Sequence, residues 1–364
     1  MTLKTLGLVI EHFDPCYGGV EKWTYNFALF IKNHFTVHLI CCTKEYPENE
    51  GITFHYFEKH SNKLTRAENC NSVISELQLD YVLDMGVGYN FDLLRPGYGS
   101  RYAEMEGNIR HTHWLYQWVK RISWYLLPRY YEFSKLMELQ YTTGGNRIVA
   151  VSDMVKQDLI RYNKVSPDSI TVMYNGIDTE KFKPNRNNNN NIIREKYNLQ
   201  NKVIFLFVGN NFQRKNLQTV LNAFHLLNRD DCHLLVVGKD KNNNTERHNI
   251  TYTGKTGQML DMYQSADVFV LPSFYDPCSN VSLEAMSCGL PVILSPYDGS
   301  SSRVTLDKEG FVMKNVTDAE ELKHYMDVLI NKNVRNEQGK NARILAESYD
   351  NKHVYQKWLE LIKS

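Results

Sequence analysis

Two adjacent cations, Arg214 and Lys215, follow a short apolar run at Val203–Val208 and precede a predicted helix. Adjacent cations at the carboxyl end of a strand can neutralise a diphosphate, because arginine offers a planar fork of donors and lysine a compact charge. An exposed basic pair can also be solvated surface, and this segment alone leaves both interpretations open.

Two carboxylates follow a later apolar run. Asp276 lies in a loop after Val268–Leu271, and Glu284 lies eight residues on, in the helix predicted before Pro291–Leu294. The start of that helix, near Ser279–Val281, offers backbone N–H groups to a phosphate. Glu284 can accept hydrogen bonds from two vicinal ribose hydroxyls. It could instead be a helix-surface acid, or a partly buried one that needs a partner.

Paired glycines form a third segment. Gly18 and Gly19, within Tyr17–Glu21, separate a predicted strand from a predicted helix. They permit close approach of the backbone to a ligand, although a plain tight turn would use the same residues. The segment is not a G-x-G-x-x-G dinucleotide fingerprint, so a nicotinamide enzyme is disfavoured.

The elements around these segments alternate between short apolar runs and longer amphipathic stretches. This pattern predicts parallel sheets covered by helices, and a length of 364 residues predicts two domains. The predicted strands of the first half are Leu6–Ile10, Thr36–Ile40, Ile52–Phe57, Tyr81–Leu83 and Ile148–Val151. A second series is expected from Ile170–Met173 on, with Val203–Val208, His233–Val237, Ile250–Tyr252, Val268–Leu271 and Pro291–Leu294. The clearest predicted helices are Glu21–Lys32, Leu64–Leu77, Pro128–Gln140, Ser152–Tyr162 and Asn351–Ile362.

Composition excludes several classes of protein. Lys plus Arg (42) nearly balances Asp plus Glu (41), so no strong field favours nucleic acid. The seven cysteines show no zinc-site spacing, and we expect them to be reduced thiols of a cytosolic protein. The first apolar run is too short for a signal peptide or a membrane span. The asparagine-rich tracts 185–191 and 242–244 are expected to be solvated loops.

The stretch 114–129 is unusually aromatic and basic, and it holds three of the five tryptophans. Amphipathic rings beside cations suit an anionic bilayer interface or a lipid-linked acceptor. The same spacing could pack a helix against the sheet of the first domain.

Taken in order, these segments resemble glycosyltransferase family 4. The resemblance runs nearly end to end and includes Gly18–Glu21, Val149–Ser152, Val172–Asp178, Arg214-Lys215 and Asp276 through Met286. The family implies an α/β fold of GT-B architecture, with two Rossmann-like domains whose parallel sheets face each other across a cleft. Two further segments, Arg95–Ser100 and Asp276–Asn280, look most like those of lipopolysaccharide-core transferases.

The resemblance also implies an activity: retaining, metal-independent transfer of a sugar from a nucleoside-diphosphate sugar, most simply a UDP-sugar, to a hydroxyl of a glycan or lipid-linked acceptor. No cofactor is expected. The setting is cell-surface polysaccharide or lipopolysaccharide biosynthesis, in the cytoplasm or at the inner face of the cytoplasmic membrane. A nucleotide-sugar epimerase or phosphorylase of the same fold, and a degenerate sugar-binding protein, remain alternatives.

Roles carried over from the family fall on particular residues. The residues expected to bind the donor are Gly18, Gly19, Gly209, Asn210, Arg214, Lys215, Gly254, Lys255, Asp276, Cys278, Ser279, Asn280, Val281 and Glu284. Arg214, Lys215, Asp276 and Glu284 are also the candidates for catalysis, together with His113. Gly97, Gly99 and Arg101 are expected on the acceptor side. No metal ligand is expected.

Four positions depart from the usual pattern. Asn210 replaces an arginine, Asn216 replaces a glycine, Asp276 shortens the first acid of the pair by one methylene, and Arg101 stands where related chains often have histidine. The expected acceptor domain spans 1–168, rejoined by a helix at 349–364, and the expected donor domain spans 169–348.

Overall fold

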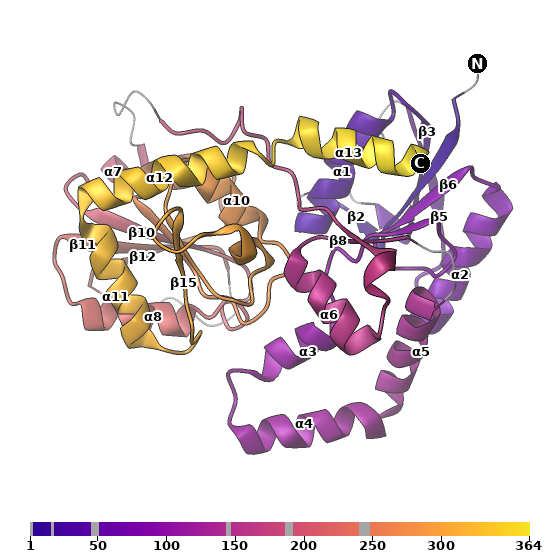
Figure 1. Ribbon diagram of the computed structural model, residues 1–364, viewed down its shortest axis with the longest axis horizontal. Helices are drawn as coiled ribbons and strands as arrows, with labels where there is room; N and C mark the ends of the chain where they lie inside the picture. Colours follow the sequence, from indigo (N-terminus) through magenta and orange to yellow (C-terminus); the bar gives the residue numbers. More distant parts are fainter. Residues whose placement is uncertain (1–2, 16–17, 45–50, 143–146, 186–191, 240–247) are drawn as a thin grey trace. The chain divides into compact units, whose positions relative to one another are not determined.

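The structure is a computed structural model that describes residues 3–15, 18–44, 51–142, 147–185, 192–239 and 248–364. The chain divides into two compact units, one of residues 1–175 with 354–364 and one of residues 176–353. We call them the first and the second domain (Figure 1). Tyr17 and the asparagine tracts at 186–191 and 242–244 lie outside the described residues.

The first domain is built on a seven-stranded parallel sheet. Its strands are, in spatial order, β5 (Ile52–Tyr56), β3 (Thr36–Cys41), β1 (Thr5–Val9), β6 (Tyr81–Asp84), β7 (Leu93–Leu94), β8 (Arg147–Ala150) and β9 (Ile170–Val172). The chain starts in the middle, runs to one edge and returns to the other, which is the doubly wound order of Rossmann-like sheets. A separate small pair joins β2 (His12–Phe13) and β4 (Thr43–Lys44).

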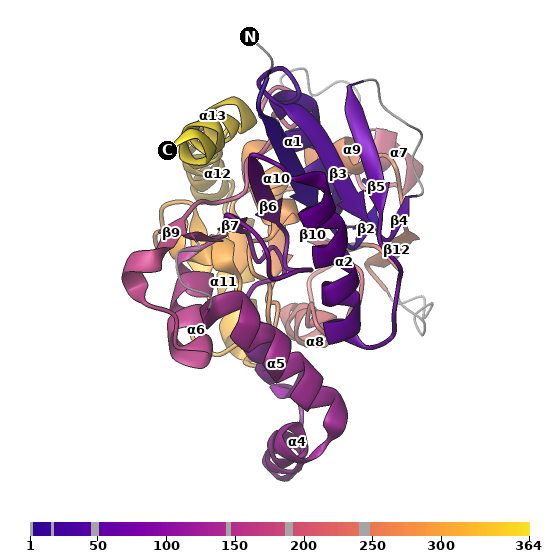
Figure 2. The same ribbon diagram turned by 90° about the vertical axis from the view of Figure 1, so that its right-hand side faces the viewer.

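Helices connect these strands. They are α1 (Gly19–Ile31), α2 (Lys63–Leu77), α3 (Arg101–Ile109), α4 (Trp114–Leu126), α5 (Pro128–Thr142), α6 (Asp153–Asn163) and the short η1 (Pro167–Ser169). The segment between β7 and β8 is an excursion of three helices, and Figures 1 and 2 both show α4 at the end of α5 farthest from the sheet. None of the helices in the described part of the chain is long and apolar enough to cross a bilayer.

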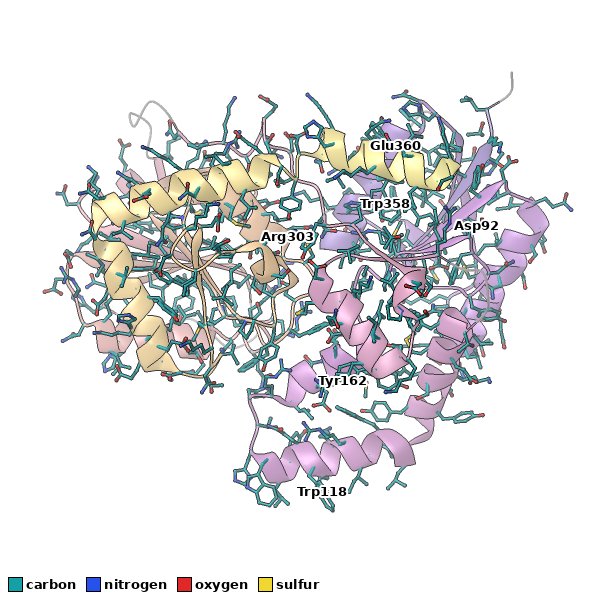
Figure 3. The ribbon with its side chains drawn as sticks, viewed as in Figure 1. Asp92, Trp118, Tyr162, Arg303, Trp358 and Glu360 are labelled. Carbon is teal, nitrogen blue, oxygen red and sulfur yellow. The ribbon has the colours of Figure 1, made fainter. Side chains whose placement is uncertain are left out.

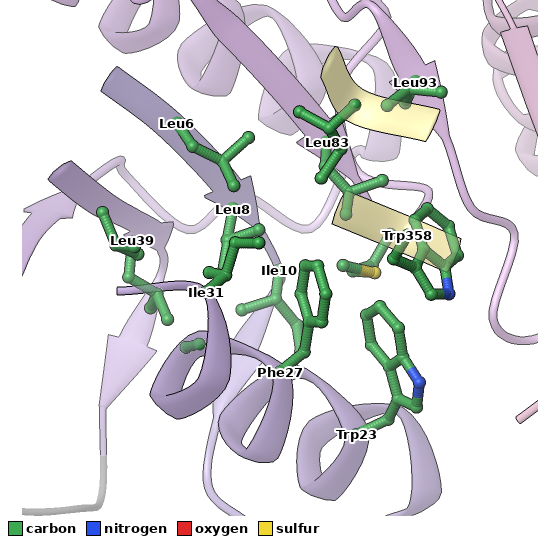
Figure 4. Packing of buried hydrophobic residues seen from close by; sticks show 14 of the residues in the cluster. Leu6, Leu8, Ile10, Trp23, Phe27, Ile31, Leu39, Leu83, Leu93 and Trp358 are labelled. Carbon is green, nitrogen blue, oxygen red and sulfur yellow. The ribbon is translucent and has the colours of Figure 1, made fainter. Parts of the chain in front are cut away.

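A final helix completes the core of the first domain. Helix α13 (Asn351–Lys363) packs Trp358 edge-on against Trp23 at a centroid distance of 5.3 Å and beside Phe27 at 5.9 Å (Figure 4). Trp358 is 1% exposed and belongs to the same apolar cluster as β1 and α1. Aromatic contacts of this kind add to the burial of large apolar area. The tail of the chain is therefore part of the first domain.

The second domain repeats the design with a six-stranded parallel sheet. Its spatial order is β12 (Ile250–Gly254), β11 (Cys232–Val237), β10 (Val203–Val208), β13 (Val268–Leu271), β14 (Val292–Leu294) and β15 (Gly310–Val312). Its two central strands, β10 and β13, are continuous apolar runs, as expected where helices cover both faces. The helices are α7 (Ile192–Lys196), α8 (Leu217–Leu227), α9 (Met259–Ser265), α10 (Asn280–Ser287), η2 (Gly299–Arg303), α11 (Ala319–Ile330) and α12 (Lys332–Glu347).

The predicted class, two Rossmann-like α/β domains with parallel sheets, is confirmed. One assignment differs. The strand at Ile170–Val172 was expected to open the second domain, but it pairs in parallel with β8 at the edge of the first sheet, Val149 opposite Thr171. Its backbone hydrogen bonds therefore hold it to the first domain, and the division falls after Asn175 instead of after residue 168.

Candidate functional site

The strand order of the second domain brings two loops together. Strands β10 and β13 are neighbours, yet their connections run to opposite sides of the sheet, so the loops after them meet at the point where the winding reverses. Ligands of open α/β sheets bind at this edge. The loop after β10 carries Lys215, and the loop after β13 carries Asp276.

Lys215 and Asp276 form a buried ion pair between these loops. The backbone around them is tightly fitted: a Cβ at Gly209 would lie 2.9 Å from Lys215 Cγ, and one at Gly238 would lie 1.9 Å from the carbonyl oxygen of Gly209. Arg214 is half-buried, and its carbonyl oxygen accepts a hydrogen bond from the N–H of Phe274 at 2.9 Å. Both predicted cations thus lie beside the loop that carries Asp276.

Asp276 is fixed by a backbone bridge to a segment that sequence reasoning missed. Its N–H donates to Tyr297 O, and its carbonyl accepts from the N–H of Gly299, both at 2.8 Å. Between these partners lies Asp298, a fully buried carboxyl group. Burial, and second the charge of Asp276, raise the pKa of Asp298 to about 7.

The helix that follows Asp276 presents its N-terminus to the same loop. Ser279 caps α10 by accepting a hydrogen bond from the N–H of Ser282 at 3.3 Å, with Cys278 buried and Asn280 and Val281 half-buried at the helix start. A capped helix start of this kind has further N–H groups that can bind an anion.

Glu284 is buried one turn into α10 and accepts a hydrogen bond from the hydroxyl of Tyr263 at 2.8 Å. Burial, followed by the charge of Glu284, raises the pKa of Tyr263 well above its usual value, so the phenol stays a donor. The sequence left Glu284 as a ribose-binding acid, an acid on the helix surface or a partly buried acid that needs a partner. The structure shows a buried Glu284 with Tyr263 as its partner. A carboxylate oxygen can accept more than one hydrogen bond, so Tyr263 leaves acceptor capacity on Glu284.

The other predicted donor-side residues flank this loop cluster. Gly254 ends β12 with φ +71° and accepts a hydrogen bond from the N–H of Gly238 at 3.0 Å. Lys255 is exposed beside it, and Asn210 is exposed after β10. All three lie at the carboxyl edge of the sheet.

Asn216, which replaces the usual glycine, has a physical explanation. Its φ is +59°, in the left-handed region that glycine occupies readily and asparagine tolerates better than most residues. Its amide nitrogen donates to Val316 O at 2.7 Å, and its amide oxygen accepts from the hydroxyl of Thr219 at 2.9 Å. The substitution therefore preserves the backbone conformation and adds two hydrogen bonds.

In the first domain, the loops after β1 and β7 also meet, although β6 lies between these two strands in the sheet. Gly18 caps α1, and a Cβ there would lie 2.6 Å from Oε2 of Glu21. The hydroxyl of Tyr98, between Gly97 and Gly99, donates to Oε1 of the buried Glu21 at 2.6 Å. Gly99 is buried with φ +72°. The predicted glycines of the two sides thus belong to one loop cluster.

Arg101 joins that cluster, whereas His113 does not. Arg101 forms an ion pair with Glu104 at 2.8 Å and lies 4.8 Å from the ring centroid of Tyr98. His113 is exposed, and its Nδ1 accepts a hydrogen bond from the N–H of Leu115 at 3.3 Å, which makes it the N-cap of α4. Its observed role is to begin that helix.

Comparison with known proteins agrees with this description. The model for "Glycosyltransferase Family 4" matches residues 17–181, and the model for "Glycosyl transferases group 1" matches residues 189–345. Between them they cover most of the chain, and the chain belongs to this family of glycosyltransferases. The sequence resemblance and the expected GT-B fold class are thereby confirmed.

Individual relatives are more distant. A UDP-Gal:alpha-D-GlcNAc-diphosphoundecaprenol alpha-1,3-galactosyltransferase of Escherichia coli is 28% identical over 60% of this chain and 58% of its own length. WaaG, a glycosyltransferase involved in lipopolysaccharide biosynthesis, has a similar fold, with a TM-score of 0.81, 18% identity and coverage of 98% of this chain and 99% of that chain. Anabaena HepE, solved with UDP and glucose, has a TM-score of 0.71 at 15% identity, with both chains fully covered. The chain spans between 45% and 63% of the length of the first curated relatives it matches.

Proposed function

We propose that this protein is a retaining glycosyltransferase that moves a sugar from a nucleoside-diphosphate sugar to a hydroxyl of a glycan or lipid-linked acceptor. The single observation that carries the proposal is the Lys215–Asp276 pair at the reversal point of the second sheet, beside the start of α10. A cation and helix N–H groups at one place can stabilise the negative charge that develops on a departing diphosphate.

We assign roles within that site as follows. Lys215 and Arg214 bind the diphosphate, the start of α10 adds N–H donors, and Glu284 accepts hydrogen bonds from the ribose. Asp276 contacts hydroxyls of the donor sugar. Because protein cations supply the charge compensation in this scheme, we propose that transfer needs no metal, and expect the rate to be unchanged by EDTA.

The names of related proteins favour a UDP-sugar as the donor of this protein. The name of the E. coli relative specifies UDP-Gal as its donor and a diphosphoundecaprenol-linked sugar as its acceptor, and HepE was solved with UDP. These names, with that of WaaG, also favour a role in building a cell-surface polysaccharide or lipopolysaccharide.

A thermal-shift screen tests donor binding. Wild type and Glu284→Ala are compared against UDP-, GDP-, ADP- and TDP-sugars. A ligand at a hundredfold excess over its Kd stabilises the native state by about 2.7 kcal/mol. Stabilisation of wild type by one base and sugar, with a much smaller effect on Glu284→Ala, is expected. Stabilisation by none of them would overturn the proposal.

Helix α4 favours a lipid-linked acceptor, because it presents its aromatic residues to solvent. Trp118 is 59% exposed and Leu126 is 74% exposed, and Figure 3 shows Trp118 pointing away from the ribbon. The sequence also allowed this stretch to pack as a helix against the sheet of the first domain. In the structure the large apolar side chains of α4 are exposed instead. The 25 residues between Glu106 and Glu132 include four cations and no acid, although Arg121 is paired with Glu106 at 2.7 Å. We propose that α4 lies on an anionic bilayer surface.

Vesicle co-sedimentation tests this contact. Wild type is expected to bind vesicles containing phosphatidylglycerol at low salt and to bind neutral phosphatidylcholine vesicles much less. Trp114→Ser/Trp118→Ser should abolish binding. Ile344→Ser, at an exposed apolar position on α12 of the second domain, should leave it intact. Equal sedimentation of all three proteins would contradict the proposal.

A further inference from the structure

Asp298 is a buried carboxyl group next to the Lys215–Asp276 ion pair, and the roles assigned above do not use it. It is the backbone bridge partner of Asp276, a pairing that places the two side chains on the same face. Its Oδ1 accepts from the N–H of Ser300 at 2.9 Å and its Oδ2 from the hydroxyl of Ser282 at 3.1 Å. It thereby ties η2 to α10 directly behind the site.

Two buried carboxyl groups lie near the ammonium group of Lys215. Asp276 comes from the loop after β13, Lys215 from the loop after β10, and Asp298 caps η2; the backbone of Arg214, the second cation of the β10 loop, is hydrogen-bonded to the loop of Asp276. The other neighbours of Asp298, Ser282 on α10 and the N–H of Ser300, are neutral donors. Burial and Asp276 raise the pKa of Asp298, while the Ser300 N–H, Lys215 and Ser282 lower it, and the result is about 7.

A bound diphosphate must compete with Asp276 for the same ammonium group. Once the ammonium group of Lys215 binds phosphate oxygens, it offsets less of the negative charge of Asp276 and Asp298. The bound diphosphate also adds its own negative charge near these two carboxyl groups. Like charges at short range cannot both stay ionised without a large cost, so one of them gains a proton.

We propose that Asp298 is a positioning residue of the donor site, where the Asp276–Asp298 pair takes up one proton from solvent as a nucleoside diphosphate captures Lys215. This inference rests on the proposed function and specifies how the site accommodates its ligand. The proton lowers the charge of the pair from minus two to minus one and removes the repulsion between the two carboxylates, so Asp276 can keep its place on the backbone bridge and share its remaining acceptor capacity with sugar hydroxyls.

Proton uptake predicts the direction in which the Kd of the nucleoside diphosphate changes with pH. Well below pH 7 Asp298 is largely protonated in the free protein, so binding takes up little further proton and the affinity should become independent of pH. Above about pH 7 the complex holds a proton that the free protein lacks, so Kd should rise by up to roughly tenfold per pH unit, until the pair also ionises in the complex. A terminal phosphate titrates near pH 6, and from about pH 7.5 its own protonation contributes little.

Calorimetry measures the uptake directly. UDP is titrated into the full chain at pH 8 in two buffers of different ionisation enthalpy, and the difference in observed enthalpy gives the number of protons taken up. Wild type should take up about one proton at most, and the count should fall toward zero below about pH 6.5.

Three variants distinguish proton uptake at Asp298 from a general effect of mutation on UDP binding. Asp298→Asn retains an acceptor for Ser300 and should bind UDP with no proton uptake and a flat pH profile. Ser282→Ala removes a hydrogen bond that favours the ionised form, so its profile should keep the same shape with a midpoint at higher pH. Asp318→Asn, at a capping aspartate of α11 in the same domain, should behave as wild type.

The outcomes are distinguishable from failure of the proposed function. UDP binding by wild type without proton uptake at pH 8, or with uptake that persists in Asp298→Asn, would overturn the inference and leave the proposed function standing. If no nucleoside diphosphate binds at any pH, the proposed function itself fails, and this inference with it.

Discussion

Both sheets are doubly wound, with seven strands in the first domain and six in the second, yet the loop clusters at their carboxyl edges differ in kind. In the second domain the side chains there are buried and paired: Lys215 with Asp276, Glu284 with Tyr263, and Asp298 with Ser282. In the first domain the loops after β1 and β7 hold glycines and the partly exposed Tyr98 and Arg101, next to one buried acid, Glu21, which accepts a hydrogen bond from Tyr98. The chain then leaves the first sheet for the α3–α5 excursion before it returns at β8.

This difference shows which properties the fold supplies and which depend on the side chains. A doubly wound sheet brings the loops of its central strands together in both domains. A network of buried charges is rigid and selects one ligand geometry, as recognition of a constant nucleotide requires. A more open loop cluster, in a domain that also carries an exposed aromatic helix, suits a larger and more variable partner. Four changes test this contrast, in order of expected effect.

Lys215→Ala should give the largest effect because it removes the central cation of the second domain. We expect turnover with the donor found by the screen to fall by about two to three orders of magnitude, comparable with loss of a key charge-stabilising group. Steady-state kinetics measures it, with Lys340→Ala on the exposed face of α12 as the control. A rate within a few-fold of wild type would show that the ion pair only stabilises the fold.

Glu284→Gln tests the second buried group. The amide oxygen can still accept from Tyr263, so folding should be preserved, while the loss of charge should weaken nucleotide binding by about 1.5–3 kcal/mol. Titration calorimetry gives this value directly. Glu337→Gln on α12 is the matched control, and equal affinities for the two variants would remove Glu284 from the donor site.

Tyr98→Phe examines the first domain. It leaves buried Glu21 without its phenol donor, so we expect a loss of about 1–3 kcal/mol in stability with nucleotide affinity unchanged. Urea unfolding followed by a first-domain tryptophan signal measures the stability. Tyr116→Phe removes a hydroxyl from the exposed α4 and should have no effect. A large loss of UDP affinity in Tyr98→Phe would contradict the division of roles between the domains.

Asn216→Gly should have the smallest effect. Glycine relieves the cost of a positive φ but loses the hydrogen bonds to Val316 and Thr219, so the two changes partly cancel and the net loss of stability should stay below about 2 kcal/mol. Turnover should remain within a few-fold of wild type. An inactive variant would show that the asparagine has a role in the reaction.

Much of this organisation could be predicted from the sequence because it is local. The apolar runs at Leu6–Ile10 and Val203–Val208 are strands within a residue of the predicted bounds. Strand β7 has two residues and β15 three, too short to give a period, and neither was predicted. The sheet to which Ile170–Val172 belongs depends on long-range pairing, so sequence alone placed it in the wrong domain.

The site shows the same limit. Lys215, Asp276 and Glu284 could be singled out as candidates because each lies next to or within an element that the sequence predicts, and the structure shows Lys215 paired with Asp276. Asp298 lies 22 residues beyond Asp276 and past another strand, and only the backbone bridge brings it to the site. Tyr263 precedes Glu284 by 21 residues, and its role follows from one hydrogen bond. In the sequence, a tyrosine at helical spacing looks like an ordinary core residue. No local signal distinguishes a core tyrosine from one whose hydroxyl group binds a buried carboxylate.

The packing of α13 has a consequence for how the chain is made. Residues 354–364 leave the ribosome only after the whole second domain, yet Trp358 covers Trp23 and Phe27 in the first. The first domain must therefore hold an uncovered aromatic surface while residues 176–353 are synthesised, during which chaperones and proteases have access to it. Premature termination between residues 175 and 354 would yield a first domain that lacks this cover, and we expect such fragments to be degraded or to aggregate, including those that contain nearly the whole second domain.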